Sequence, residues 1–198
     1  MHLIFKHTKN NNKKEEKGLS LIESAMVLAL AATVTAGVMF YYQSASDSNK
    51  TQAAISEVMS ATSAINGLYI GQSSYSGLDV SILKNSSAIP DNYKKGSDIM
   101  NPFGGTLAVT AAGNTTSGYG YSLTLDKLPK SACISLATLN LGTSAAGYGI
   151  NISGTSINFG NNLGSTNAKT SAITPSEAAN STTGCSKDTD NTVTYYMK

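Results

Sequence analysis

A single carboxylate, Glu23, stands beside a long uncharged segment. No charged side chain occurs from Ser24 to Tyr42. A charge inside a membrane helix costs on the order of 2.5–3.5 kcal/mol at mid-bilayer, although it costs little at the interface, which is the simpler explanation. If the chain were cut before Leu19, the new α-ammonium group would lie one helical turn from Glu23. Glu23 could then neutralise the terminus of its own chain or that of a neighbouring subunit. This spacing favours an assembly role for Glu23 over a catalytic one.

Two cysteines, Cys133 and Cys185, follow the uncharged segment. If that segment directs export, both thiols reach an oxidising compartment, where disulfides persist. Closing a loop of about 50 residues would stabilise the fold by about 4 kcal/mol on the chain-entropy estimate. Export favours a disulfide over the alternative, two buried free thiols. A metal site is not expected, because His2 and His7 are the only histidines and lie at the N-terminus.

Composition argues against catalysis and nucleic-acid binding. No histidine follows His7, so later residues offer no Ser-His or Cys-His pair, and we expect neither an enzyme nor a cofactor. The chain contains no arginine and its net charge is +2. Residues 1–18 hold five lysines against two glutamates, so the remainder is nearly neutral and exerts no long-range attraction for nucleic acid.

The uncharged segment is long enough to cross a membrane. As a helix, residues 19–42 would span about 36 Å, against a bilayer core of roughly 30 Å. The lysines of residues 1–18 favour a cytoplasmic N-terminus. That charged leader stops at Gly18, so we predict cleavage between Gly18 and Leu19. An ordinary signal peptide cut at A-L-A-A, residues 29–32, is the alternative, but the helical pattern continues past it.

The helical pattern becomes one-sided after Tyr42. Apolar residues recur at steps of four and three, whereas Glu57 and several serines are assigned to the polar side. No proline precedes Pro90. The sequence therefore predicts one helix over residues 19–70, of which residues 19–42 form a membrane or filament core. The apolar stripe consists of Ala54, Val58, Ala61, Ile65 and Leu68.

Residues 71–198 are predicted to form a globular head of the α+β class. Turn-rich residues 71–103 precede candidate strands at 106–111 and 119–125, a helix at 128–141 and a hairpin of strands 148–152 and 156–159. A capping box, T-P-S-E at residues 174–177, predicts a short helix to about Ser181. The last strand, residues 192–197, should lie inside the sheet and pair non-locally.

The motif K-G-L-S-L-I-E, followed by the uncharged segment, resembles the prepilin signal of type IV pilins. This resemblance implies the type IV pilin fold, a long N-terminal helix packed on a mainly antiparallel sheet with short extra helices. It also implies that a prepilin peptidase cuts after Gly18 and N-methylates Leu19. Glu23 then corresponds to the fifth mature residue, which pairs with a neighbour's N-terminus in that family. The long leader and Leu19 resemble the type IVb branch, and Cys133 and Cys185 fit the family's disulfide region.

The resemblance further implies a structural subunit of a helical homo-oligomeric fibre that mediates adhesion and bacterial autoaggregation. Its precursor would reside in the inner membrane, and the fibre would be extracellular. The implied partners are the peptidase, an inner-membrane assembly platform, a cytoplasmic ATPase and an outer-membrane secretin. Two alternatives remain, a minor pilin or type II secretion pseudopilin, and a single-pass membrane-anchored periplasmic protein.

Overall fold

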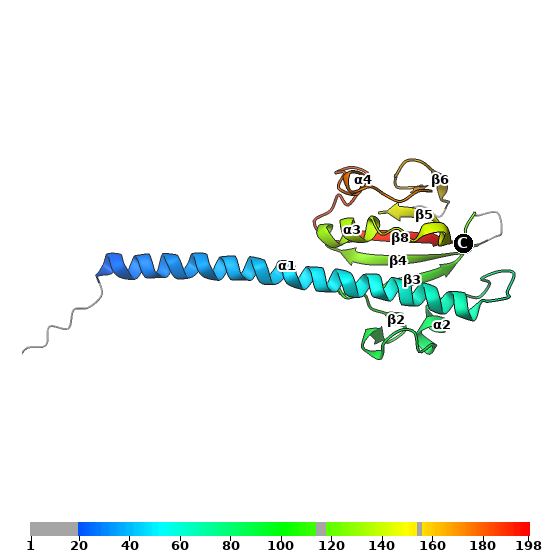
Figure 1. Cartoon of the computed structure of the whole chain (residues 1–198), viewed down its shortest axis with the longest axis horizontal. Coiled ribbons are helices and arrows are strands. Elements are labelled where there is room, and N and C mark those ends of the chain that lie inside the picture. Colours follow the sequence, from blue (N-terminus) through cyan, green and yellow to red (C-terminus); the bar gives the residue numbers. More distant parts are fainter. Residues whose placement is uncertain (1–19, 114–117, 154–155) are drawn as a thin grey trace, which may run out of the picture. The chain divides into compact units, whose positions relative to one another are not determined.

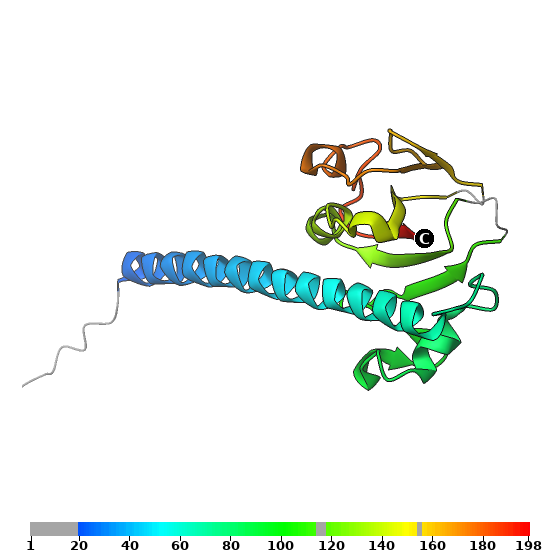
Figure 2. The ribbon, with the colours of Figure 1, turned by 45° about the vertical axis from the view of Figure 1, so that its right-hand side comes forward.

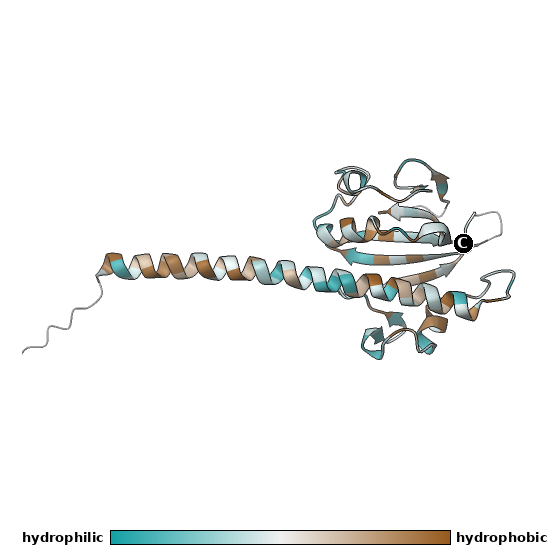
Figure 3. Cartoon of the chain, viewed as in Figure 1, coloured by the Kyte–Doolittle hydropathy of each residue, from teal (hydrophilic) through white to brown (hydrophobic). Residues whose placement is uncertain are grey.

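The computed structural model describes residues 20–113, 118–153 and 156–198. The chain divides into two compact units, Met1–Gln43 and Ser44–Lys198. Helix α1, Leu21–Leu68, contributes to both units. Its first half carries the dense apolar segment that is visible by hydropathy in Figure 3. The helix thus begins and ends within two residues of the predicted bounds, 19 and 70.

The second half of α1 packs on the head through one stripe. Ala54, Val58, Ala61 and Ile65 are fully buried there. Glu57 is buried as well, so its assignment to the polar side was wrong. The physical reason is the spacing, because Glu57 lies three residues after Ala54 and four before Ala61, on the same face.

A six-stranded sheet forms the centre of the head, with strand order β3-β4-β8-β5-β7-β6 (Figures 1 and 2). Its pairs are antiparallel except β6 with β7. The last strand, β8, lies between β4 and β5, which confirms the predicted non-local pairing. The strands are β3 Leu107–Ala111, β4 Tyr121–Leu128, β5 Ala145–Ile150, β6 Asn158–Gly160, β7 Asn167–Lys169 and β8 Asn191–Met197.

The segment between α1 and β3 contains short elements held by side-chain caps. Asp79 caps α2, Val80–Asn85, by accepting the Ser81 backbone N–H at 2.7 Å. The turn N-P-F-G-G closes around Asn101, whose side-chain oxygen accepts from Phe103 and Gly105. Gly105 is required because a Cβ there would collide with Asp126. The remaining elements are η1 Asp91–Tyr93, β1 Lys94–Lys95 and β2 Asp98–Ile99.

The two later helices exist but are shorter than predicted. Helix α3 covers Lys130–Ala137, and Pro129 precedes it as an extended cap residue. A 3-10 turn, η2 Gly142–Ser144, follows. Helix α4 covers Pro175–Ala178, and its predicted capping box between Thr174 and Glu177 is present. The helix stops early because the Cys185 and Gly184 backbone N–H groups bond to the carbonyls of Ala178 and Asn180.

The predicted hairpin between strands 148–152 and 156–159 is wrong. Strand β5 ends at Ile150 and pairs with β8 and β7, whereas β6 pairs in parallel with β7. Its proposed turn includes residues 154–155, which lie outside the described residues. The reason is that β8 and β7 bury both edges of β5, and long-range pairing overrides a local turn signal.

Candidate assembly site and the disulfide-bridged region

Glu23 and Ser20 form a reciprocal cap at the start of α1. The Ser20 backbone N–H donates to the Glu23 carboxylate at 3.0 Å, and the Ser20 hydroxyl oxygen accepts the Ile22 N–H at 3.3 Å. The Ser20 carbonyl accepts the first intrahelical bond, from Ser24, at 3.0 Å. These bonds cap the helix start and satisfy N–H groups that it would otherwise leave free. Its sequence signal is the S-x-x-E pattern before an apolar run, which was not among the predicted caps.

The first half of α1 exposes its apolar side chains. From Leu21 to Tyr42, the large ones are between 59% and 87% exposed. Among the described residues, α1 is the one helix long and apolar enough to cross a membrane. So large an exposed apolar surface is unfavourable in water and is typical of a segment that lies in lipid or against other apolar surfaces.

Hydroxyl groups within the apolar half are already satisfied by its own backbone. Thr33 donates to the Leu30 carbonyl at 2.9 Å, and Thr35 donates to the Ala31 carbonyl at 2.7 Å. Because these bonds are internal, neither hydroxyl needs water or a neighbouring side chain. The segment therefore presents an apolar surface despite its threonines.

Gly18 and Leu19, the predicted cleavage and N-methylation residues, lie outside the described residues. Glu23 is described and exposed, at the end of α1 that follows them. The structure places the Glu23 carboxylate in the first helical turn, and both its assembly role and the cleavage stay predictions.

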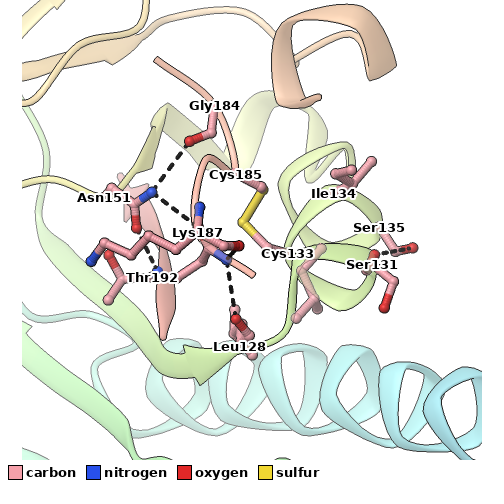
Figure 4. Close-up of a disulfide and its surroundings, with 12 residues drawn as sticks. Leu128, Ser131, Cys133, Ile134, Ser135, Asn151, Gly184, Cys185, Lys187 and Thr192 are labelled. Carbon is pink, nitrogen blue, oxygen red and sulfur yellow. Dashed lines mark hydrogen bonds between the residues drawn. A yellow bond between two sulfur atoms is a disulfide. The ribbon is translucent and has the colours of Figure 1, made fainter. Parts of the chain in front are cut away.

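Cys133 and Cys185 form a disulfide in the structure (Figure 4). Cys133 lies on α3, and Cys185 lies in the segment after α4. Both cysteines are fully buried. The bridge connects positions 52 residues apart in sequence, and it fastens the α4 segment to the helix that packs on the sheet.

Two asparagines that were not among the predicted functional residues connect this segment to three strand ends. The buried Asn191 amide donates to the carbonyls of Leu128, at 3.2 Å, and Lys187, at 2.6 Å. The Asn151 amide donates to the Gly184 carbonyl and to Asn191, both at 3.2 Å. Asparagine is common in loops, so no sequence pattern distinguished these two.

An ion pair between Lys169 on β7 and Glu177 on α4 also connects the α4 segment to the sheet. Their ion pair has an Nζ–Oε2 distance of 2.6 Å. Glu177 also accepts the Thr174 backbone N–H at 2.9 Å as part of the capping box. The hydrogen bond from Lys169, aided by Thr174, lowers the pKa of Glu177 to about 2. The carboxylate is therefore ionised whenever the ion pair is intact.

Nothing in the described part of the chain has the pattern of a metal site. Residues 20–113, 118–153 and 156–198 contain no group of three or more histidine, cysteine, aspartate or glutamate side chains that could hold a metal ion. These residues provide an exposed apolar helix surface, an exposed carboxylate at Glu23 and a disulfide bridge.

Two solved structures define the fold class as type IV pilin. The type IVb pilin of Salmonella typhi aligns with a TM-score of 0.50 at 19% identity, covering 76% of this chain and 99% of that one. TcpA, a type IV pilin from Vibrio cholerae El Tor, aligns with the same TM-score at 12% identity, covering 74% and 98%. Likeness at this identity establishes the fold alone.

Sequence comparison defines the family. A family model named Bundlin matches residues 43–197. Major structural subunits of bundle-forming pilus from Escherichia coli O127:H6 and O111:H- are each 70% identical over 193 residues, covering 94% of this chain and 97% of theirs. The chain belongs to the bundlin family of structural pilus subunits, which are not enzymes.

Proposed function

We propose that the chain is the major structural subunit of a type IVb bundle-forming pilus, a surface fibre built from many copies of this chain. The observation that carries this proposal is the 70% identity to two such subunits over nearly the whole chain. The exposed apolar half of α1 supports it, because a monomer in water could not leave that surface uncovered.

Assembly is proposed as an exchange of one apolar environment for another. Before assembly, residues 19–42 lie in the inner membrane. During assembly, they move into a bundle of identical helices at the fibre axis. Apolar surface avoids water in both states, so the transfer does not require a large change in hydrophobic free energy. Small residues such as Ala29, Ala32 and Gly37 allow close helix approach.

Processing and the charge of Glu23 give the fibre its register in this proposal. A prepilin peptidase removes residues 1–18 and methylates the amino group of Leu19. The Glu23 carboxylate of one copy then pairs with the Leu19 terminus of the next. The platform, ATPase and secretin expected from the family supply the force and the exit path. Repeated weak contacts between heads along fibres would support adhesion and autoaggregation.

The composition of sheared surface fibres tests this proposal. Mass spectrometry should identify this chain as the dominant protein, and cells lacking its gene should carry no such fibres. Presence in trace amounts would indicate a minor pilin or a pseudopilin. Recovery only from the inner membrane would indicate a membrane-anchored periplasmic protein, and either result would contradict the proposal.

A further inference from the structure

Glu57 is an acidic side chain buried where the second half of α1 packs on the head. It is 4% exposed, and its neighbours on the same face, Ala54, Val58 and Ala61, are fully buried. These three belong to the apolar core that also contains the inward side chains of β3, β4 and β8. A glutamate is rarely buried at this depth without a partner.

Neither carboxylate oxygen of Glu57 has a hydrogen-bond partner in the described structure, and both are shielded from solvent. An ionised carboxylate in such surroundings is far more costly than the neutral acid. The ion pairs among the described residues, Lys94–Asp91 and Lys169–Glu177, do not involve it. The packing therefore tolerates Glu57 mainly as the protonated acid.

The titratable groups around the α1 contact do not compensate this charge. On the core side of the strands, the Tyr195 hydroxyl donates to the Leu136 carbonyl at 2.7 Å, and the Tyr121 hydroxyl is itself buried without a partner. Burial is the one cause that raises the pKa of Glu57, to about 7. Because both Glu57 oxygens lack a partner, no charged side chain on the packed elements bonds to it. These side chains are Asp47 and Lys50 on α1, Asp79, Lys84, Asp91, Lys94, Lys95 and Asp98 before β3, Asp126 and Lys127 on β4, and Lys130 on α3.

We propose that Glu57 is a protonation-sensitive latch between helix α1 and the head. The neutral acid allows residues Ser44–Leu68 to pack on the sheet. Ionisation places an unpaired charge in that contact and loosens it. This device belongs to the single subunit and does not depend on fibre formation.

The direction of the effect follows from linkage. The pKa of Glu57 in the folded state lies above the ordinary value of 4.5. Its contribution to stability is therefore fully present below that ordinary value and is lost as pH rises through about 7. The loss corresponds to roughly two powers of ten in the folding equilibrium constant.

Hydrogen exchange tests the latch on the full chain in detergent micelles. Between about pH 5 and about pH 8.5, wild-type amides of residues 54–68 should lose protection, after correction for the intrinsic exchange rate. Glu57→Gln cannot ionise and should show no such loss. Asp47→Asn, a half-buried acid on the same helix, serves as the matched control and should keep the wild-type pH response. Equal profiles for wild type and Glu57→Gln would overturn the latch.

A titration of the wild-type carboxyl carbon of Glu57 by NMR decides the question without any variant. The latch requires a midpoint well above the ordinary range, close to 7. A midpoint near 4.5 would overturn it, because the ionised group would then be tolerated in the packed state.

Discussion

A hydrogen bond within the same chain holds the Glu23 carboxylate at the start of α1. Its bond from the Ser20 N–H uses one of several acceptor positions on the carboxylate. The remaining positions are available to a cation. The cap therefore holds the carboxylate at the start of α1 and leaves acceptor positions free. This arrangement suits the proposed pairing with a neighbouring terminus.

Glu23→Gln should separate the cap from the charge. Glutamine at this position still supports a capping box, so we expect normal membrane insertion and an intact helix start. The charge is lost, so fibres should be absent by electron microscopy. Ser20→Ala is the matched control, because it weakens the cap by about 1 kcal/mol but keeps the charge, and it should still give fibres. Normal fibres from Glu23→Gln would remove the charge from the assembly mechanism.

Glu177 should make the head sensitive to acid, in the direction opposite to Glu57. Its pKa is lowered from 4.5 to about 2, chiefly by the hydrogen bond from Lys169. The stability that it contributes is present above pH 4.5 and is lost as pH falls toward 2. Thermal unfolding of the full chain should show this loss, and Glu177→Gln should flatten the profile in that window. An unchanged acid profile in the variant would show that the ion pair does not contribute.

At the scale of the element, the sequence was most informative where a pattern is local. Periodicity predicted α1, and T-P-S-E predicted α4, because both signals act within a few residues. Strands β5 and β7 could not be predicted with their partners. The segment A-A-G-Y-G-I of β5 has no alternation, and N-A-K of β7 has low strand propensity. Strand β5 pairs with β8, the last strand of the chain, and β7 pairs with β5 and β6, so no local signal specifies either partner.

The candidate site was likewise predictable only where the signal lies in a short segment of sequence. Glu23 and the two cysteines were identified from charge and composition. Predicting the burial of Glu57 would have required knowing how wide the packed face of α1 is. Predicting the roles of Asn151 and Asn191 would have required knowing that three strand ends meet. These features depend on non-local packing that no short segment encodes.

The disulfide should account for much of the stability of the α3–α4 region. Replacing both cysteines, Cys133→Ser with Cys185→Ser, avoids a stray thiol. We expect the free energy of unfolding to fall by about 4 kcal/mol on the chain-entropy estimate. Chemical denaturation of the full chain in detergent measures it, with Ser176→Ala on the exposed surface of α4 as the control. If the free energy of unfolding fell no more than in the control, the contacts of Asn151, Asn191 and Lys169 would be sufficient to stabilise this region without the disulfide.

At the scale of the whole molecule, the chain combines a uniformly apolar helix half with a head that buries a conventional core. The first would expose a large apolar surface to water, whereas the second buries its apolar core within a single copy. This difference suits a subunit that exists first in a membrane and later in a fibre.

The intact mass and N-terminal sequence of the dominant subunit in sheared surface fibres test the central claim most directly. We predict a chain that begins at Leu19 and carries one added methyl group on its N-terminal residue. Fibres whose subunit retains residues 1–18, or begins after the apolar segment, would contradict it, because the helix proposed to build the fibre core would then be blocked or missing.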